Sequence, residues 1–488
     1  MPRAFLPKLL PYQDKMHFQF ATRILATSLL LAGSFNDCFA EEVELFNGKD
    51  FSNWHGRTTV NPAKWGSIPE ADKAKWNQEI KDHWSIEGDV IVSDGKGAYL
   101  TTNQEFGDFE FSFDYWIVPG SDSGVYLRGI PQVQIWDPNA ENNKANGNEK
   151  GSGGLWNNPA GWGGKDPLVR ADKPVGEWNA MRIRLIGERC TVWLNNSCVV
   201  KNERLANYFE KGEPLFAKGP IQLQTHGAEI RWRNLKLKEF TSDEANKLLS
   251  EAEEELLPTS TTLTTIKTVV TPISSTTTAT TRTETMEKFQ SIFNGKDLTG
   301  WLGATSNYSV VGGAIQCQSG KGGNLYSEKA FSDYVMRVDF QLPPGGNNGL
   351  LVRYPSQSEI DLVPKDKRSN DGAYVGMTEL QVLDDSHGKY KSIDPRQTHG
   401  SAYGLAAAKR GFLRRAGEWN HQVVTVLGST IIVELNGTRI LDADLSKVTE
   451  YMADSPHPGK DRTSGHVGFA GHNDPVRFRN VEIRSIAK

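Results

Sequence analysis

The sequence predicts a mainly β protein in which one β-sandwich or jelly-roll domain occurs twice. The phrase "NGKDFSNWHG" at 47–56 returns as "NGKDLTGWLG" at 294–303. The chain has 488 residues, which exceeds what one ordinary hydrophobic core holds. It contains 47 Gly and 13 Trp, a composition that suits strands and turns. These observations favour two β domains over a helical bundle.

The N-terminus has the features of a secretory signal peptide. Basic residues precede the apolar run "ILATSLLLAG" at 24–33, and "CFA" ends at Ala40. We expect residues 1–40 to be a signal peptide and the mature protein to be exported to the periplasm or outside the cell. A lipid anchor on Cys38 is the alternative and leaves cell-surface association open, although "FNDC" lacks the small residues of an attachment site. No other segment approaches the roughly 18 consecutive apolar residues of a transmembrane helix.

The charge balance argues against two classes of partner. The whole chain has a formal net charge of −4, and the leader removes more basic than acidic residues. A mildly acidic protein is poorly suited to bind nucleic acid or an anionic membrane. The chain also lacks CxxC, HExxH and His-rich runs, so we expect no structural zinc site.

The two copies share a series of motifs in the same order. The pairs are "SDSGVYLRG" (121–129) with "NNGLLVRY" (347–354), "QVQIWD" (132–137) with "ELQVLDD" (379–385), "GEWN" (176–179 and 417–420), "VWLNNSCVV" (192–200) with "VELNGTRIL" (433–441), and "GPIQLQTHGAEIRWRNLKL" (219–237) with "GHVGFAGHNDPVRFRNVEI" (465–483). The order is typical of a duplicated domain. We place the two copies at 41–240 and 289–488.

Strand signals dominate inside each copy. Stretches such as "FEFSFDYWIV" and "VMRVDFQL" alternate apolar and polar residues or are rich in β-branched and aromatic side chains. Gly, Pro, Asn and Asp separate these stretches. Many short strands within about 200 residues are typical of two antiparallel sheets packed face to face.

The segment at 241–288 differs in composition from both copies. "TSDEANKLLSEAEEELL" at 241–257 opens with a Thr-x-x-Glu capping box and has apolar residues at helical spacing, so we expect a short helix. Of the next 28 residues, 17 are Thr or Ser. Without a periodic apolar face, this part is expected to be a flexible tether.

The repeated opening phrase has two interpretations. Asn-Gly is a turn signal, and the spacing of Phe51 or Leu298 to Trp54 or Trp301 allows both apolar groups to be buried behind a tight turn. The alternative is a Trp that stacks on a sugar ring. We favour the structural turn.

Taken together, the motifs resemble those of the 3-keto-disaccharide hydrolase domain family. They cover 43–240 and 289–487, and six of them occur in order in each copy. The resemblance implies a concanavalin-like (lectin/glucanase-type) jelly roll, common in secreted proteins of sugar-degrading bacteria. It also implies that the ligand is an oligosaccharide or a glycoside oxidised to a ketone at carbon 3.

The best candidate site lies in the second copy. In "ELQVLDD", Glu379 and Gln381 point to one face of a strand while Leu380 and Val382 point to the other. Arg353, at the end of a neighbouring strand, and Asp384 complete a set of fixed donors and acceptors that suits a polyol. An Arg–carboxylate pair that ties two strands together is the alternative.

Further residues of the second copy are expected to contact the sugar. His472 matches a position where the family keeps a His, and a turn His that caps loop carbonyls is equally consistent with the sequence. We also include Asn348, and His399 and Tyr403 from the loop at 384–404. No cofactor is expected with certainty. The carboxylates and His residues of this loop leave a divalent metal as an option, without a fixed ligand spacing that supports it.

The first copy departs from this pattern at one decisive position. Gln132 stands where the second copy has Glu379, so the polar face consists of Gln132, Gln134 and Trp136. The remaining candidates for ligand contact in this copy are Arg128, Asp137 and His226. Loss of the carboxylate favours binding in the first copy and chemistry in the second.

The stretch "EIDLVP" at 359–364 resembles the E-x-D-x-x-E motif of endoglucanases with a related jelly roll. Its second Glu is replaced by Pro364. A retaining mechanism with two carboxylates is therefore not supported.

The family resemblance implies a mechanism for the second copy. A ketone at C3 acidifies the proton on C2, so a base removes it and the C1 substituent leaves before water adds. We assign Glu379 as the base, Arg353 or a bound cation as the stabiliser of the enolate, and His472 or Asp384 as the proton donor. The alternatives are a non-catalytic tandem carbohydrate-binding (lectin-like) protein, which gains avidity from two modules, and a structural cell-surface protein.

Overall fold

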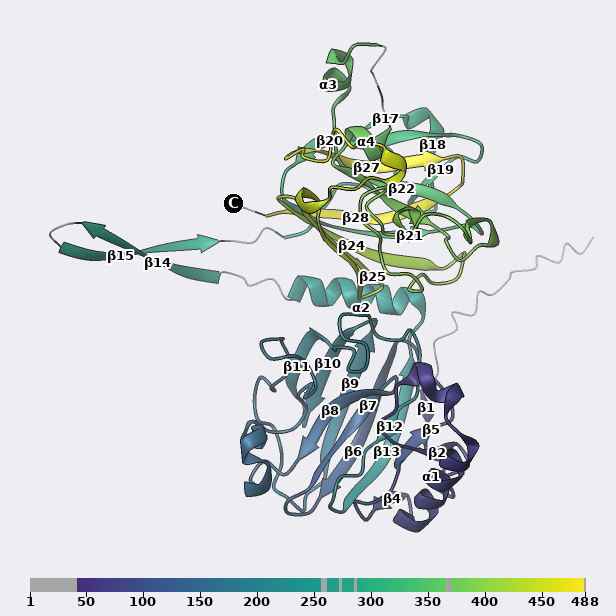
Figure 1. The fold of residues 1–488 in the computed structure, drawn as a ribbon, viewed down its shortest axis with the longest axis vertical. Coiled ribbons are helices and arrows are strands. Elements are labelled where there is room, and N and C mark those ends of the chain that lie inside the picture. The colour runs from purple at the N-terminus through teal and green to yellow at the C-terminus, as the bar shows by residue number, and fades with distance from the viewer. Residues whose placement is uncertain are drawn as a thin grey trace, which may run out of the picture. The chain divides into compact units, whose positions relative to one another are not determined.

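The computed structural model describes residues 42–255, 261–271, 274–284, 288–365, 369 and 371–486. The expected signal peptide at 1–40 and Cys38 lie outside these residues. The chain is mainly β, with four antiparallel sheets divided between the two copies (Figure 1). Within the described ranges, no helix is long and apolar enough to cross a lipid bilayer.

The first copy pairs an eight-stranded sheet with a five-stranded sheet. The eight-stranded sheet has the order β11-β10-β9-β6-β13-β4-β3, with β1 added to β13, and the five-stranded sheet has the order β2-β5-β12-β7-β8. The strands are β1 Val43–Glu44, β2 Trp54–Arg57, β3 Trp84–Glu87, β4 Val90–Ser93, β5 Tyr99–Thr102, β6 Phe109–Ile117, β7 Asp122–Leu127, β8 Ile130–Trp136, β9 Asn179–Ile186, β10 Arg189–Leu194, β11 Ser197–Arg204, β12 Gln222–Leu223 and β13 Ile230–Glu239.

The second copy repeats this arrangement. Its eight-stranded sheet has the order β18-β19-β28-β21-β24-β25-β26, with β16 added to β28, and its five-stranded sheet has the order β17-β20-β27-β22-β23. The strands are β16 Gln290–Ser291, β17 Trp301–Gly303, β18 Tyr308–Val311, β19 Ala314–Cys317, β20 Gly322–Phe331, β21 Tyr334–Gln341, β22 Asn347–Tyr354, β23 Thr378–Leu383, β24 Trp419–Leu427, β25 Thr430–Leu435, β26 Thr438–Asp444, β27 Gly465–His472 and β28 Arg477–Ser485.

Each hydrophobic core lies between its two sheets. The nine residues of β6 alternate between buried and half-buried, as the sequence pattern predicts for a strand with one face in the core. In the second copy, Phe469 of the five-stranded sheet stacks on Phe478 of the eight-stranded sheet with ring centroids 3.9 Å apart. Such contacts join the sheets face to face and confirm the sandwich. The outer face of each five-stranded sheet is left available for polar side chains.

The opening phrase of each copy is a turn, as expected. Asn47 Oδ1 accepts hydrogen bonds from the backbone N–H groups of Lys49 and Asp50, and Asn294 does the same in the second copy. Trp54 and Trp301 are buried in the two cores. Neither indole is therefore placed to stack on a sugar.

Short helices supplement the sheets. The expected helix after the first copy is present as α2, and Thr241 and Glu244 form the predicted capping box. The α-helices are α1 Glu70–His83, α2 Ser242–Glu255, α3 Gln357–Leu362 and α4 Gly372–Val375. The 3₁₀ helices are Pro62–Ser67, Glu141–Asn146, Asn148–Lys150, Thr305–Asn307, Gly388–Tyr390, Pro395–Gln397, Leu445–Lys447 and Met452–Asp454.

The Thr-rich segment differs from its expected form. We expected a tether without secondary structure, whereas the structure contains a two-stranded antiparallel hairpin of β14 (Thr261–Thr271) and β15 (Ser274–Glu284). Thr, Val and Ile are β-branched and favour extended backbone, so a segment that lacks a core-facing pattern still pairs with itself.

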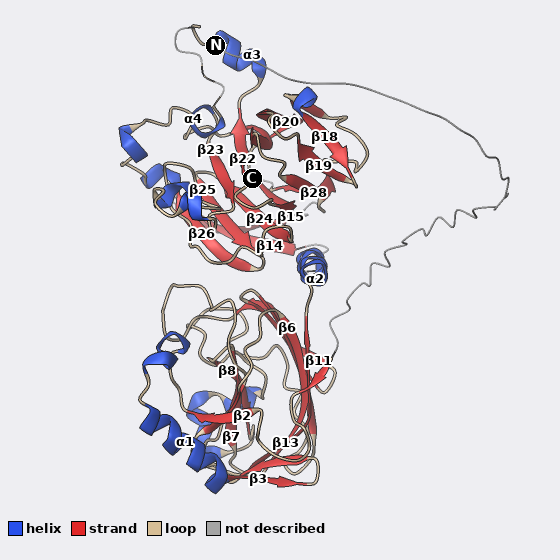
Figure 2. Ribbon diagram, turned by 90° about the vertical axis from the view of Figure 1, so that its right-hand side faces the viewer, coloured by secondary structure: helices blue, strands red, loops and turns tan. Residues whose placement is uncertain are grey.

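The two copies differ by one insertion, which lies next to the candidate site. In the first copy, β7 and β8 are joined by Arg128 and Gly129 alone. In the second copy, β22 and β23 are joined by the segment at 355–377, which carries α3 and α4 (Figure 2). Ser356 and Glu359 form a capping box at the start of α3, which accounts for the first Glu of "EIDLVP" without a catalytic role.

Candidate functional site

The candidate site of the second copy lies on the outer face of its five-stranded sheet. Strands β22 and β23 pair so that Leu351 is opposite Glu379 and Gly349 is opposite Gln381. Leu380 and Val382 of β23 point the other way and belong to the core. The period of two residues therefore puts Glu379 and Gln381 on the outer face, as the sequence predicts.

Glu379 is almost completely enclosed. Its residue is 4% exposed. A Cβ on Gly349 would lie 2.1 Å from Glu379 Oε1, and a Cβ on Gly372, in α4, would lie 3.7 Å from Oε2. Two glycines thus make room for the carboxylate, one in the neighbouring strand and one in the inserted segment. Substitution of Gly349 cannot be accommodated unless Glu379 moves.

Glu379 and His472 form a pair across the sheet. His472 Nε2 lies 3.5 Å from Glu379 Oε1, and the imidazole side chain is 47% exposed. Burial raises the pKa of Glu379 above its usual value, while the contact with Glu379 raises the pKa of His472. A buried carboxyl beside an accessible imidazole is a suitable acid–base pair, because burial and the mutual contact shift both pKa values.

Gln381 has an unused acceptor on the same face. Its Nε2 donates to Asn347 Oδ1 at 2.8 Å, while its Oε1 is buried without a hydrogen-bond partner. In the first copy the matching amide Gln132 donates from Nε2 to Gln134 Oε1, the atom equivalent to Gln381 Oε1. A protonated Glu379 could therefore donate a hydrogen bond from its carboxyl O–H to Gln381 Oε1.

Two tyrosines and one carboxylate lie near Glu379, and the sequence predicted one of them, Tyr403. Tyr403 donates its backbone N–H to the Glu379 carbonyl at 2.9 Å, and its hydroxyl accepts from Gln397 Nε2 at 2.9 Å. Burial raises the pKa of Tyr374, and the charges of Tyr403, Asp371 and Glu379 raise it further. Tyr374 and Asp371 come from the inserted segment, which has no counterpart in the first copy and gave no motif to recognise.

Arg353 occupies a structural position and not the site face. Its guanidinium donates to the carbonyls of Ser332, Gly428 and Arg462, each at 2.8 Å, and pairs with Asp333 Oδ1 at 2.8 Å. The residue is 1% exposed. The alternative of an Arg–carboxylate pair that ties strands together therefore describes Arg353 better than the role of enolate stabiliser.

Arg128 repeats this arrangement in the first copy. It donates to the carbonyls of Gly107, Gly187 and Phe216 and pairs with Asp108. Both arginines have a positive φ, 52° for Arg128 and 49° for Arg353. The Arg that the two motifs share therefore has the same structural role in both copies.

Three other predicted residues of the second copy serve the loops or the core. Asp384 accepts hydrogen bonds from Gly345 N–H and Ser386 O–H; burial opposes ionisation, yet these bonds hold its pKa below the usual value. Asn348 is fully buried and faces the core, so its neighbour Asn347 occupies the site face instead. His399 packs against Phe340 with the two rings tilted by 32°, and burial lowers its pKa to about 3.

These placements change the assigned roles. Asp384 stays ionised and is a poor proton donor, and Asp137 in the first copy likewise accepts from the backbone N–H groups of Gly120 and Asn139. A turn aspartate after a strand and a catalytic aspartate look alike in sequence, which is why sequence analysis did not separate them.

The corresponding face of the first copy contains a pocket of about 300 Å³. Gln132, Gln134, Trp136 and His226 line it, as predicted, together with Asp122. His226 Nδ1 lies 3.4 Å from Asp122 Oδ2, and this contact raises the pKa of His226. The carboxylate that pairs with the imidazole thus lies on β7 in the first copy, whereas in the second copy it lies on β23, the strand that corresponds to β8.

Metal binding receives no support from side-chain geometry. Among the residues that the structure describes, no group of three or more His, Cys, Asp and Glu side chains is arranged to hold a metal ion. The carboxylates of the loop at 384–404 instead contact loop backbone and, at Asp385, Arg410.

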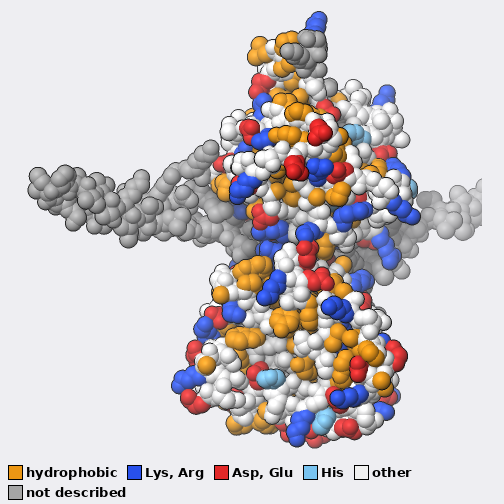
Figure 3. Space-filling model, viewed as in Figure 1, with side chains coloured by type: hydrophobic (Ala, Val, Ile, Leu, Met, Phe, Trp, Pro, Cys, Tyr) orange, Lys and Arg blue, Asp and Glu red, His pale blue; other side chains and the backbone are white. Residues whose placement is uncertain are grey.

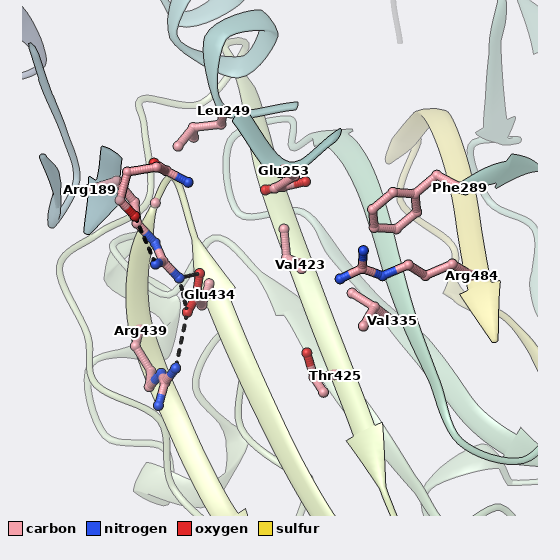
Figure 4. Close-up of a pocket in the computed structure, with 12 residues that line it drawn as sticks. Arg189, Leu249, Glu253, Phe289, Val335, Val423, Thr425, Glu434, Arg439 and Arg484 are labelled. Carbon is pink, nitrogen blue, oxygen red and sulfur yellow. Dashed lines mark hydrogen bonds and ion pairs between the residues drawn. The ribbon is translucent and has the colours of Figure 1, made fainter. Parts of the chain in front are cut away.

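A different pocket, of about 240 Å³, lies on the outer face of the eight-stranded sheet of the second copy (Figure 4). Val335, Val423 and Thr425 form part of its lining, and Glu434 points toward Arg439 of the adjacent strand, 3.4 Å away. Glu434 also pairs with Arg189, whereas Arg484 Nε and Nη1 are buried without a hydrogen-bond partner. Because the pocket belongs to the other sheet, it has no part in the Glu379 site.

Comparison with known proteins identifies the family. The profile of the 3-keto-alpha-glucoside-1,2-lyase-like domain matches residues 41–238 and again 288–484. The chain belongs to this family. The 3-keto-alpha-glucoside-1,2-lyase-like domain accordingly occurs twice, within a few residues of the predicted boundaries, and the membership places the chain among carbohydrate-active proteins.

Individual relatives are more distant. The chain is 26% identical over 228 residues to a 3-keto-disaccharide hydrolase of Bacteroides thetaiotaomicron, across 40% of this chain and 77% of that protein. A solved structure from Parabacteroides distasonis, named as a candidate glycosyl hydrolase, is 25% identical with a TM-score of 0.35 and covers 41% of this chain and all of the other. A carbohydrate-binding module from Bacillus subtilis is 14% identical with a TM-score of 0.25, over 38% and 90% of the two chains.

Proposed function

We propose that the second copy is an enzyme that cleaves 3-keto-glycosides by removing the proton next to the ketone. The observation that carries this proposal is the pair of enclosed Glu379 and accessible His472, 3.5 Å apart on the outer face of the five-stranded sheet. Family membership supplies the substrate class. The curated relative from Bacteroides thetaiotaomicron, a 3-keto-disaccharide hydrolase, supports the same choice.

The reaction proceeds by elimination followed by addition of water. The Glu379 carboxylate takes the proton from C2, and the C–H electron pair moves to form the enolate of the C3 ketone. The enolate then re-forms the ketone, a C1–C2 double bond is made and the C1–oxygen bond breaks. His472, as imidazolium, gives its proton to the departing oxygen. Water adds at C1 and gives one proton to the now neutral His472, while the proton held by Glu379 returns to C2.

Gln381 stabilises the proton-loaded form of the base. After abstraction, Glu379 is a neutral acid with an O–H to donate, and Gln381 Oε1 is a buried acceptor without a partner. In the first copy the Gln132 amide, which resembles a protonated glutamate in shape, makes the equivalent hydrogen bond to Gln134. Gln381 is thus a positioning residue that lowers the cost of holding the proton.

The enolate oxygen needs a hydrogen-bond donor, and the Tyr403 hydroxyl fills this role. Its oxygen accepts from Gln397, which leaves its O–H available to donate, and its backbone is fixed beside Glu379. A preorganised donor at the position where charge develops lowers the barrier more than one in water does. Arg353 is not used, because its donors are committed elsewhere.

The test compares two isosteric substitutions in the full-length protein. Glu379→Gln removes the base, and Glu328→Gln removes an exposed carboxylate of the same copy. We expect Glu379→Gln to lower kcat for a 3-keto-glucoside by at least about 1000-fold, and Glu328→Gln to leave it unchanged. Release of the aglycone is followed with and without a chelator. Full turnover by Glu379→Gln removes Glu379 from the mechanism.

A second candidate function is a tandem carbohydrate-binding protein without catalysis. The observation in its favour is the first copy, where Gln132 replaces the base and a pocket lined by aromatic groups remains. Binding on a glycan array, together with no product from any 3-keto-glycoside, decides for this alternative. We further propose export of the mature protein, which supports an extracellular or periplasmic substrate; N-terminal sequencing of the secreted form tests cleavage after Ala40.

A further inference from the structure

The pocket of the first copy is constructed differently from the site of the second. It lies on the outer face of the five-stranded sheet, and Tyr99, Asp122 and Tyr126 contribute to its lining from β5 and β7. Gln224, directly after β12, lies at its floor. Hydrophobic side chains gather on this face of the first copy around a histidine (Figure 3).

Gln224 offers an acceptor that the protein itself does not use. The residue is 7% exposed, and its Oε1 is buried without a hydrogen-bond partner. Its Nε2 lies 3.5 Å from Tyr126 Oη, and its backbone N–H donates to Gly124 O at 3.0 Å. An unpaired buried carbonyl oxygen is costly, so a ligand hydroxyl that donates to it recovers that free energy.

The polar groups beside Gln224 form a fixed chain. Gln132 donates to Gln134, Gln134 Nε2 donates to Asp122 Oδ1 at 2.7 Å, and Asp122 Oδ2 contacts His226. Both oxygens of the Asp122 carboxylate thus have partners within the protein, and the His226 imidazole stays exposed. This arrangement offers a polyol side-chain acceptors and the His226 imidazole, which donates when it is protonated. It holds no carboxylate at the position that corresponds to Glu379.

Aromatic rings supply the walls. Trp136 and the half-buried Trp156 pack edge to face with centroids 5.3 Å apart, and Tyr99 and Tyr126 do so at 5.5 Å. Such rings provide apolar surface for the C–H face of a pyranose while the amides address its hydroxyls. The matching strand positions of the second copy hold Asn324 and Leu351 in place of the two tyrosines.

Charge limits the ligand class. The described residues that line this pocket include one carboxylate, Asp122, which contacts Gln134 and His226, and no Lys or Arg. An acidic sugar would find no cation there apart from His226, which Asp122 already occupies. The pocket therefore suits an uncharged ligand.

We infer that the first copy binds a neutral, unoxidised saccharide, with its C3 hydroxyl donating to Gln224 Oε1 and a sugar ring against the half-buried Trp156. A ketone cannot replace this hydroxyl, because two acceptors do not pair. The first copy thus recognises the alcohol form of a sugar, and the second acts on the ketone form. The inference rests on the proposed function only in taking a saccharide as the ligand class.

Tryptophan fluorescence tests the inference in full-length protein that carries Glu379→Gln, which prevents turnover in the second copy. The probes are trehalose, maltose, cellobiose, their 3-keto forms and a glucuronic acid disaccharide. We expect at least one neutral disaccharide to change the tryptophan fluorescence, and the part of the binding that depends on Gln224 and Trp156 to be at least about tenfold tighter for it than for its 3-keto form. The acidic disaccharide should not bind.

Gln224→Leu should weaken this binding by about tenfold or more, whereas Gln222→Leu, two residues earlier and outside the pocket lining, should leave it within twofold. Trp156→Leu provides an independent variant if Gln224→Leu fails to fold. The inference is overturned if no neutral disaccharide binds, if the acidic sugar binds better, if tighter binding of the 3-keto sugar is itself weakened by Gln224→Leu or Trp156→Leu, or if both variants bind the neutral sugar like the parent. Because turnover is not measured, failure here is distinct from failure of the proposed reaction.

Discussion

Removal of Arg353 should destabilise the second copy without impairing its chemistry. In Arg353→Ala, the carbonyls of Ser332, Gly428 and Arg462 lose this donor, and the Asp333 carboxylate loses the guanidinium while keeping the Gly428 N–H. Breaking a buried ion pair from one side costs about 3–5 kcal/mol. This is a large share of the roughly 5–15 kcal/mol that stabilises a domain.

Urea unfolding measures this cost. With an m-value of about 2 kcal/mol/M, a loss of about 4 kcal/mol lowers the midpoint of the second-copy transition by about 2 M. Arg128→Ala is the matched control, because Arg128 makes the same contacts in the first copy and should lower only the first-copy transition. In water at low temperature, kcat per folded Arg353→Ala molecule should stay within twofold of wild type. An unchanged midpoint together with a kcat lowered more than about 100-fold would refute the structural assignment and restore a chemical role for Arg353.

Three further predictions concern the site and the turns. The proposed mechanism needs ionised Glu379 and protonated His472, whose pKa values are raised from 4.5 and 6.5. The value of kcat/KM should therefore rise with pH through the pKa of Glu379 and fall through the pKa of His472. His472→Asn should abolish the fall at alkaline pH, and a fall that persists in this variant assigns it to another group. Gly349→Ala places a Cβ 2.1 Å from Glu379 Oε1 and should lower kcat at least about 100-fold. The control Gly124→Ala, in the first copy, should leave turnover of 3-keto-glycosides unchanged. Equal rates in the two variants contradict the assigned position of Glu379. Hydrogen bonds from Asn294 and Thr299 lower the pKa of Asp297 to about 2. The stabilising effect of this carboxylate should therefore be present above the usual carboxyl pKa and fade as the pH falls toward 2, and NMR titration measures the pKa of Asp297. Asp297→Ala should leave kcat/KM unchanged, since the turn is remote from the chemistry.

Much of the fold was accessible from the sequence because it depends on short-range patterns. The duplicated turn at Asn47 and Asn294, the alternation in β6 and the capping box at Thr241 each act over a few residues. The Thr-rich segment was the exception, since β propensity alone allowed it to pair with itself. The domain boundaries followed from repetition and did not require knowledge of the packing.

The site could be predicted only in part. Alternation identified Glu379 and Gln381 as neighbours on one face, and the last-strand motif identified His472. Asn348 was wrong by one residue, because the faces alternate and only the pairing with β23 shows which face is outer. Arg353, Asp384 and His399 are chemically attractive residues whose donors and acceptors are used by loops and core, which no local pattern reveals.

The sequence by itself determined that the chain holds two β-sandwich copies and that the copies differ at Gln132 and Glu379, because duplication and strand alternation are properties of the chain order. Tertiary structure alone decided which polar groups remain available. Burial enclosed Glu379 beside His472, the insertion at 355–377 brought Tyr374 and Asp371 to it, and pairing of β7 with β8 placed Asp122 beside His226. Availability depends on partners distant in sequence, and only the folded chain brings them together.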